Sequence, residues 1–452
     1  MKTTSSIFFA LLMPLASAWA QRSAVLEAYV QEGLTRNAAL QQQSKVQEQY
    51  AERVKQADGL RLPSVGFNAS YTLAAGGRSI ELPIGDLLNP VYSTLNDITG
   101  TNNFPTVENT KEQFLPNNFQ QTNLEVQYPV FNNDIRYNRS IQRHLAEGQY
   151  AQLQAQTNDT RYRITEAYLR YLQTIEAEKI WLNTKVVLGE LRTFNASLVR
   201  NNVATKDVVA TADYELSKAD NELYKIRSQQ NTVRAYFNQL LYRDLQTPII
   251  ADTILLDLPA DTFTLDTLIR YARAHRQEFK ALQAGMAATD DNLRLQEAKL
   301  KLPNAYIGGE LGFQGFGYNL LDEQAYALGQ VGLTYDIFQG GIRKSKAQEA
   351  RLEKERIQLQ YNDLEQQIVL QVTQNHNNFV AAYQTWQTSR QGLQAAEEIF
   401  RIVTNKYRAG NQLLIEWLDA QNRVTAARLQ VLVSYADLLI QENNVKASIG
   451  YP

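Results

Sequence analysis

Two acidic residues near the C-terminus, Glu416 and Asp419, have a type and spacing that could do chemistry. They are three residues apart in a segment with helical periodicity, so they share one helix face. Carboxylates that face a narrow opening attract cations and can bind a divalent metal. A solvated coiled-coil face carries the same residues without such a role, and the two residues alone favour this second interpretation.

Residues that usually carry catalysis form no recognisable motif in this chain. His144, His275 and His376 are scattered, and none has a second ligand at metal-binding spacing. The sequence has no Gly-x-Ser-x-Gly segment, and residues 341–345 lack the spacing of a phosphate-binding loop. Lys344 instead opens a polar helix face. We therefore predict that the protein is not an enzyme and needs no cofactor.

Composition excludes further classes of protein. The chain has 452 residues, a formal net charge of −2 and no cysteine. The balanced charge gives no sign of nucleic-acid binding, and without cysteine there is no disulfide, no thiolate metal site and no cysteine that could carry a lipid. Mean hydropathy is −0.38. Beyond the N-terminus no apolar run approaches the ~20 residues of a spanning helix, which excludes a helical membrane protein.

The N-terminus has the three parts of an export signal in order. Lys2 supplies a positive charge, residues 7–15 are an apolar core, and Ala18-Trp19-Ala20 is a small-x-small cleavage site. This pattern predicts a signal peptide at residues 1–20 and a mature chain that starts at Gln21.

The mature chain is one unit used twice. Residues 60–71 (LRLPSVGFNASY) resemble residues 300–311 (LKLPNAYIGGEL), and residues 124–136 (LEVQYPVFNNDIR) resemble residues 331–343 (VGLTYDIFQGGIR). We predict a first repeat at residues 21–248 and a second repeat at residues 249–452. The first copy carries an insertion, residues 76–118, which is rich in Gly, Pro and Asn and therefore favours turns and loops.

Each copy contains two strand-like segments, which we place at about residues 64–75, 121–131, 304–315 and 326–338. Their period-two alternation indicates one apolar and one polar face, as in a soluble sheet on a core or in a membrane barrel with lipid outside and water inside. Four strands cannot close a barrel, because the smallest single-chain barrels have about eight, and an open edge in lipid leaves backbone groups unpaired. Either the sheet is not in a membrane, or several chains share one barrel.

The rest of each copy is predicted to be helical. No proline and a single glycine, Gly392, lie between residues 341 and 410, which gives a helix on the order of 100 Å long; residues 134–201 repeat it. Shorter helices are expected at about residues 23–58, 206–244, 264–300 and 413–448, stacked end to end against the long ones. Apolar residues recur at coiled-coil spacing, among them Ile164, Tyr168, Leu172, Ile175 and Leu182 in the first copy and Trp417, Val424, Val431, Leu438 and Val445 in the second.

These features together resemble the TolC-like outer-membrane efflux protein family over essentially the whole mature chain. The most specific segments are LKLPNAYIGGEL, LTYDIFQGGIRKSKA and, at residues 406–424, KYRAGNQLLIEWLDAQNRV. The resemblance implies an α+β membrane protein whose homotrimer forms a 12-stranded β-barrel continued by a periplasmic α-helical barrel. The expected strand–helix junctions are Pro63, Pro303, Gly340 and Gly341.

The function that this resemblance implies is that of a passive exit duct. Such a protein lies in the outer membrane of a Gram-negative bacterium with a large periplasmic part. It contacts outer-membrane lipid and docks an inner-membrane pump through a periplasmic adaptor, in an efflux or type I secretion system. Two alternatives remain at this point: a structural or adhesive outer-membrane coiled coil without an open lumen, and a monomeric soluble helical protein.

The resemblance also gives the acidic pair and the helix turns a role at the periplasmic tip. Glu416 and Asp419 match the positions of an acidic entrance ring. Tyr407 and Asp207 are candidates for contacts that close the tip, although Tyr407 is equally well a seam residue. Gln412 occupies the place of an arginine that some members carry, which argues against their closing salt bridge. Candidate adaptor contacts in the two turns, which are otherwise plain helix–helix turns, are Asn202, Val203, Ala204, Ala409 and Gly410.

Overall fold

The computed structural model describes residues 23–252, 264–318 and 322–451. The predicted signal peptide, residues 1–20, lies outside this part of the chain. The chain divides into two compact units. One comprises residues 52–143 and 288–354 and is called the strand unit; the other comprises the remaining described residues and is called the helical unit. Four helices contribute residues to both units: α2 (Ala38–Gly59), α4 (Asn133–Arg200), α7 (Gln277–Lys301) and α8 (Ile342–Arg408).

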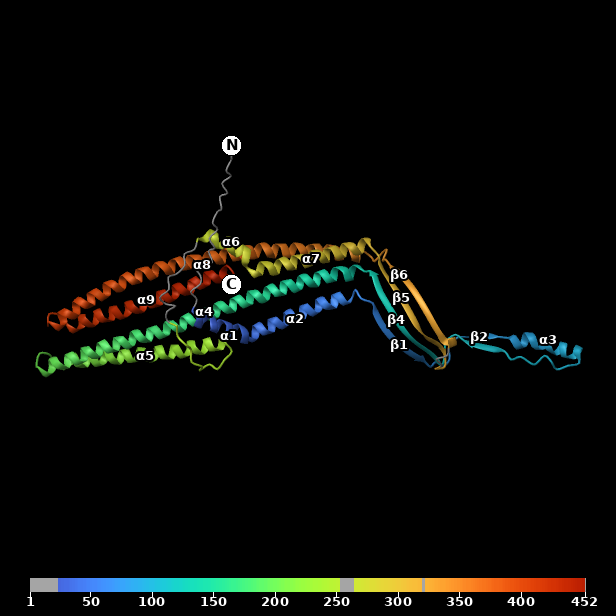
Figure 1. Ribbon diagram of the computed structural model, residues 1–452, viewed down its shortest axis with the longest axis horizontal. Coiled ribbons are helices and arrows are strands. Elements are labelled where there is room, and N and C mark those ends of the chain that lie inside the picture. The colour runs from blue at the N-terminus through green and yellow to red at the C-terminus, as the bar shows by residue number, and fades with distance from the viewer. Residues whose placement is uncertain (1–22, 253–263, 319–321, 452) are drawn as a thin grey trace, which may run out of the picture. The chain divides into compact units, whose positions relative to one another are not determined.

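The strand unit contains a four-stranded antiparallel sheet in the order β1-β4-β5-β6 (Figure 1). The strands are β1 (Ser64–Thr72), β4 (Phe119–Phe131), β5 (Asn304–Phe316) and β6 (Ala325–Thr334). The last strand is shorter than the predicted 326–338. Its residue Thr334 pairs with Asn304, the first residue of β5, so no partner backbone remains for residues beyond it. Strands β1 and β6 form the two edges, and neither edge pairs with another strand of the described residues.

Register places the alternating residues of neighbouring strands on common faces. Phe67, Leu124 and Leu311 lie opposite one another across three strands, as do Tyr128, Ile307 and Val331 across another three. This apolar face is solvent-exposed, with Phe67 at 68% and Val331 at 80%. The other face is polar, and on it Asn123 and Tyr326 both donate hydrogen bonds to Glu310, at 3.1 and 3.2 Å.

The insertion in the first copy is more ordered than the sequence predicted. It contains a two-stranded ladder, β2 (Ser79–Leu82) with β3 (Thr110–Gln113), and the helix α3 (Ile84–Thr99). Apolar residues at helical spacing outweigh the turn-forming composition here, and Gly100 ends the helix in a left-handed conformation at φ 65°. The return loop is held by paired side-chain to backbone bonds, between Asn89 and Val107 and between Asn96 and Phe104.

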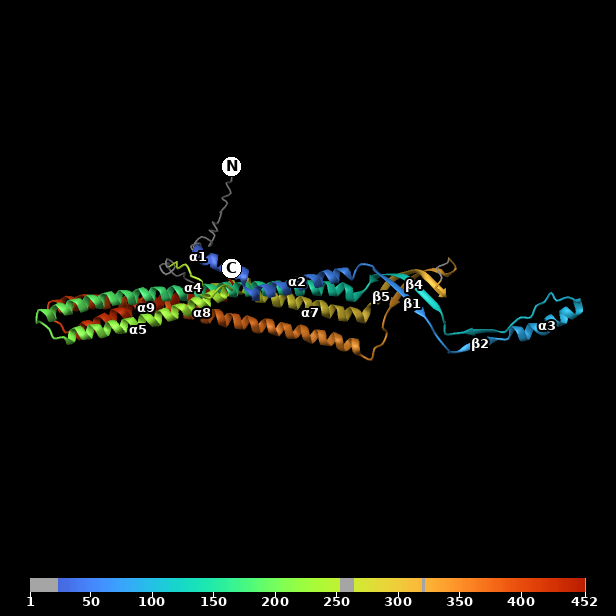
Figure 2. The same ribbon diagram turned by 90° about the horizontal axis from the view of Figure 1, so that it is seen from below.

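The helical unit is built from two helical hairpins, which can be followed in Figure 2. One pairs α4 (Asn133–Arg200) with α5 (Asp207–Leu240), and the other pairs α8 (Ile342–Arg408) with α9 (Leu414–Ser448). No helix of the described residues has the length and apolar character needed to cross a bilayer.

Two of the shorter helices that we expected to be continuous are each broken. The segment predicted at 23–58 is α1 (Ala24–Arg36) and α2 (Ala38–Gly59), and that predicted at 264–300 is α6 (Leu265–His275) and α7 (Gln277–Lys301). The residues at the breaks, Asn37 and Arg276, are extended, with ψ of 112° and 125°. The Asn37 side chain then caps the second helix by accepting from Leu40 N at 3.1 Å.

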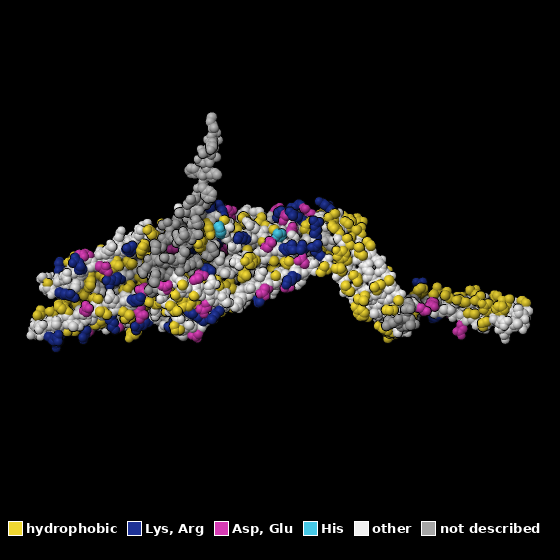
Figure 3. Space-filling model, in the orientation of Figure 1, with side chains coloured by type: hydrophobic (Ala, Val, Ile, Leu, Met, Phe, Trp, Pro, Cys, Tyr) yellow, Lys and Arg dark blue, Asp and Glu magenta, His cyan; other side chains and the backbone are white. Residues whose placement is uncertain are grey.

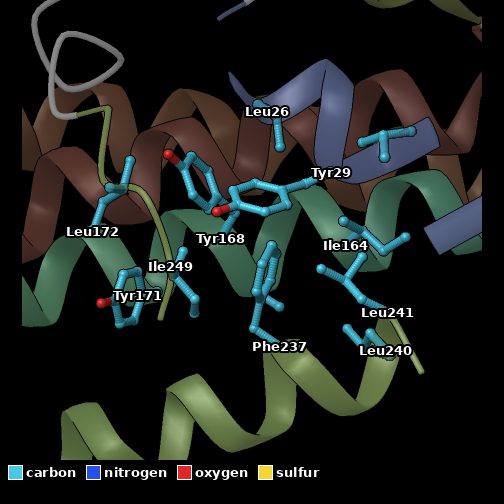
Figure 4. Packing of buried hydrophobic residues seen from close by; sticks show 12 residues of the cluster. Leu26, Tyr29, Ile164, Tyr168, Tyr171, Leu172, Phe237, Leu240, Leu241 and Ile249 are labelled. Atoms are coloured by element: carbon cyan, nitrogen blue, oxygen red, sulfur yellow. The ribbon is translucent and has the colours of Figure 1, made fainter. Parts of the chain in front are cut away.

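Three apolar clusters hold the helices of this unit together. Figure 4 shows the first, in which Tyr29 of α1, Tyr168 of α4 and Phe237 of α5 point toward one another. The second joins α6 to α8 and α9, and the third lies between the hairpins near their turns. The predicted seam residues Ile164, Tyr168 and Leu172 are fully buried, whereas Leu182 is 41% exposed in the single chain.

Candidate functional site

The candidate site is the end of the helical unit where both hairpins turn, which we call the tip: residues 192–213 and 400–421. The two turns have the same backbone geometry. Asn202 and Gly410 adopt left-handed conformations, with φ of 56° and 77°. Val203 N donates to Leu198 O and Asn411 N donates to Lys406 O, both at 2.9 Å, which closes the ends of α4 and α8 in the same way.

Tyr407 is buried between the hairpins rather than at the surface. Its hydroxyl donates to Asn195 Oδ1 of α4 at 2.8 Å, and its ring meets Phe194 edge-on at a centroid distance of 5.9 Å. Burial raises the pKa of the Tyr407 hydroxyl above its ordinary value, so the group stays neutral. Tyr407 therefore joins the second copy's hairpin to the first copy's.

Asn195 is a functional candidate that the sequence analysis missed. It is fully buried, and its amide nitrogen donates to Val208 O of α5 at 3.0 Å, so one side chain links three helices. A signal for it does exist in the sequence, because Leu188, Leu191 and Asn195 follow coiled-coil spacing and the first two are buried. A buried asparagine at such a position specifies register and partner at a cost in stability.

Asp207 does not take part in the Tyr407 contact. It lies in the first turn of α5 and accepts a hydrogen bond from the Thr205 hydroxyl. A carboxylate at this end of a helix is favoured by the helix dipole. The structure thus brings Tyr407 together with Asn195, and it separates Asp207 from that bond.

Glu416 and Asp419 are both exposed on the first turns of α9, and each has a local partner. Glu416 Oε2 accepts hydrogen bonds from Leu413 N, at 3.2 Å, and from the side-chain amide of Gln412. The bond from Leu413 N caps the start of α9. Asp419 forms an ion pair with Arg423 at 2.8 Å. Within the described residues no group of three or more His, Cys, Asp or Glu side chains could hold a metal ion.

An aromatic cluster supports the acidic turn from the inside. Trp417 is 4% exposed, donates from Nε1 to the Thr404 hydroxyl at 3.0 Å and contacts Phe400 edge-on. Because Trp417 lies between the two carboxylates in sequence but points inward, it fixes α9 against α8. This packing determines which way Glu416 and Asp419 face.

The predicted junction residues lie between helix and strand. Pro63 and Pro303 immediately precede β1 and β5. Gly340 and Gly341 have φ of 56° and 85° and precede α8. The first copy makes its junction without glycine, because Asn132 accepts from Ile135 N at 3.2 Å and caps α4 directly.

Comparison with known proteins finds similarity to outer-membrane efflux proteins and to solved outer-membrane channels. Residues 268–451 match the model of the outer membrane efflux protein family. Toxin and drug export protein A of Aggregatibacter actinomycetemcomitans is 24% identical over 179 residues, and the match covers 39% of each chain, well under two thirds of that relative.

Solved structures share the fold over nearly the whole chain. The outer-membrane channel OprN is 16% identical with a TM-score of 0.74, over 95% of this chain and 91% of that one. VceC of Vibrio cholerae is 14% identical with a TM-score of 0.73, over 94% and 96%. The open-state channel MtrE of Neisseria gonorrhoeae is 15% identical with a TM-score of 0.74, over 94% and 89%. At such identities the likeness establishes the fold.

The predicted resemblance to the TolC-like outer-membrane efflux proteins agrees with these comparisons: the family model matches residues 268–451, and the solved channels share the fold over nearly the whole chain. That family model is described as one of outer membrane efflux proteins, and it covers less than half of this chain.

Proposed function

We propose that three copies of this chain close a twelve-stranded barrel, continue as a periplasmic helical barrel, and act as the passive exit duct of an efflux or secretion system. The main support for this proposal is the four-stranded sheet, which has one exposed apolar face and, among the described residues, two unpaired edges. In lipid every backbone group needs a partner, so the edges of β1 and β6 must pair with other copies. The polar face then lines a water-filled lumen.

The proposal includes the two repeats, residues 21–248 and 249–452, as the units that bring two strands and one helical hairpin each. It also assigns the tip turns, with Asn202, Val203, Ala204, Ala409 and Gly410, to contacts with a periplasmic adaptor that connects an inner-membrane pump. Val203 is 72% exposed in its turn, so its side chain is accessible to such a partner.

The tip carries two further proposed roles. Glu416 and Asp419 from three copies would form an acidic entrance ring that favours cations, because both carboxylates are exposed on one face of α9. Tyr407 would keep the tip closed through Asn195, because the bond is buried and joins the two hairpins. Asp207 would hold the neighbouring turn through Thr205 rather than bond Tyr407.

Single-channel current in a planar bilayer tests the duct and the ring together. We expect a small, cation-selective conductance from the wild type, and the double variant Glu416→Gln/Asp419→Asn should lose most of that selectivity. The matched control is Asp213→Asn, an exposed carboxylate on α5 that is paired with Arg192. Unchanged selectivity in the double variant would remove the ring. A folded trimer that never conducts, even with a destabilised tip, would remove the duct.

A further inference from the structure

A cavity at the first strand–helix junction is lined by arginines that the proposed duct does not use. It lies between the end of α2, the end of β4 and the start of α4, and its volume is about 770 Å³. We call it the arginine cavity, and the residues that line it are Asp58, Arg61, Leu62, Tyr128, Pro129, Val130, Phe131, Asn132, Ile135, Arg136 and Arg139.

The cavity carries an excess of positive charge. Asp58 is the one carboxylate among the described residues that line the cavity. Its side chain already forms a hydrogen-bonded ion pair with Arg139. That hydrogen bond lowers the pKa of the Asp58 carboxyl, and the charges of Arg143 and Arg61 lower it further, so Asp58 is ionised and neutralises one guanidinium. The charges of Arg61 and Arg136 remain.

The side chain of neither arginine has a hydrogen-bonding partner among the described residues. Their guanidinium groups form no ion pair and no hydrogen bond in that part of the chain. Arg136 only lies over the ring of its neighbour Tyr137, at 5.6 Å. At the second junction the corresponding Arg343 donates hydrogen bonds to two backbone carbonyls, Lys299 O at 2.8 Å and Ile337 O at 3.3 Å. The first junction therefore keeps donors free for a ligand.

The other half of the cavity lining is apolar rather than charged. Leu62 and Val130 are 66% and 53% exposed, and Tyr128 begins the apolar face of the sheet opposite Ile307. A group that satisfies both halves has an anionic head with fixed oxygens and an apolar tail. Arginine forks fit phosphate oxygens in a bidentate way, and basic residues next to membrane-spanning segments attract phospholipid headgroups.

We propose that the arginine cavity binds the phosphodiester headgroup of a membrane phospholipid, with Arg61 and Arg136 on the phosphate and Leu62 and Val130 against the start of its acyl chains. This proposal rests on the proposed function in one respect, namely that the apolar face of the sheet lies in lipid. The cavity, at the end of that face, then lies at the depth of the lipid headgroups. Figure 3 shows Lys and Arg side chains gathered on the helices of the strand unit, close to where these helices meet the strands.

Native mass spectrometry of the protein in mild detergent tests the proposal, with dipalmitoyl phosphatidylglycerol as the probe. We expect at least one retained lipid per chain for the wild type and at least fivefold less for Arg61→Gln/Arg136→Gln. The matched control is Lys344→Gln/Lys346→Gln, which removes the same charge from exposed positions of α8 outside the cavity. The control should retain the wild-type lipid.

Two further probes separate the sources of binding. Equal retention of dipalmitoylglycerol, which lacks the phosphate, would overturn the headgroup role. Full displacement of the lipid by millimolar inorganic phosphate would reduce the cavity to a plain phosphate site and overturn the lipid assignment, as would equal lipid loss in both variants. The same spectrum reports oligomeric state. A trimer without lipid contradicts this inference alone, and a lipid-binding monomer contradicts the proposed function alone.

Discussion

The two strand–helix junctions share a sequence motif but use its arginine differently. At the second junction Arg343 donates to two backbone carbonyls and lies over Tyr335 at 5.5 Å. At the first junction Arg136 has the same place in the motif, but its guanidinium lines a cavity and has no hydrogen bond or ion pair with any described residue. The second junction contains Gly340 and Gly341, which give its backbone more conformational freedom, and the bonds of Arg343 restrict that freedom. At the first junction Asn132 caps α4, so no bond from Arg136 is needed to fix the backbone.

The two tip turns show a similar division of labour. Their backbones match, with Asn202 in the place of Gly410. Their side chains do not, because the second copy supplies the buried Tyr407 and the first supplies its acceptor, Asn195. A repeat thus preserves the path of the chain while its side chains diverge into complementary partners. The hydrogen bond at the tip exists only because the two copies have become different.

The largest expected effect comes from breaking that complementarity. Asn195→Ala removes the acceptor of Tyr407 and the bond to Val208, and it leaves the tyrosine hydroxyl buried without a partner. The cost is about 1–3 kcal/mol at the tip. We expect open-channel current to rise severalfold in planar bilayers and tryptic cleavage at the tip to accelerate.

Tyr407→Phe should have the same direction and a smaller size, since it keeps the aromatic packing. Tyr214→Phe is the control, because this tyrosine of α5 is 64% exposed and outside the cluster. Unchanged current and cleavage in Asn195→Ala would show that the bond does not hold the tip.

A second prediction separates the two junction arginines. Arg343→Ala should lower the unfolding temperature of the oligomer, because it forfeits charge-assisted bonds worth about 1.5–3 kcal/mol to two carbonyls. Arg136→Ala should leave the unfolding temperature within error, since no bond is lost. Differential scanning fluorimetry of both variants in one detergent measures the contrast. Equal shifts would mean that the junctions are equivalent after all.

The smallest expected effect concerns the left-handed residues of the two turns. Gly410→Ala places a Cβ at φ 77° and should cost about 1 kcal/mol. Asn202→Gly should cost nothing or stabilise slightly, because its φ of 56° is one that glycine adopts freely. Thermal unfolding followed by circular dichroism compares the pair. A larger loss for Asn202→Gly would indicate that its side chain, rather than its backbone, is needed.

Periodicity was the part of the sequence that could be interpreted reliably. Alternation over residues such as Phe67 and Val331 marks strand faces, and coiled-coil spacing identifies buried positions such as Tyr168 and Leu172, because both patterns follow directly from backbone geometry. The repeat is visible because segments such as residues 124–136 and 331–343 keep the same residues at matching positions, among them Tyr128 with Tyr335 and Arg136 with Arg343.

Features that depend on tertiary partners could not be predicted in this way. The breaks at Asn37 and Arg276 carry no Gly or Pro signal, and helix α3 lies within a segment whose composition favours turns. The bond from Tyr407 to Asn195 joins residues from different copies. The free state of Arg136 can be seen only by comparison with Arg343, whose acceptors are backbone carbonyls that no side-chain pattern marks.

Cross-linking of the open sheet edges tests the central claim most directly, that three copies close one barrel. The natural chain has no cysteine, so Asn68→Cys on β1 can be combined in turn with Leu328→Cys, Gln330→Cys or Thr334→Cys on β6, all on the polar face. The account predicts that at least one pair, oxidised in native outer membranes, gives a ladder that ends at the covalent trimer, while each single variant gives none. Absence of cross-links from every pair, or a ladder that continues past three chains, would contradict it.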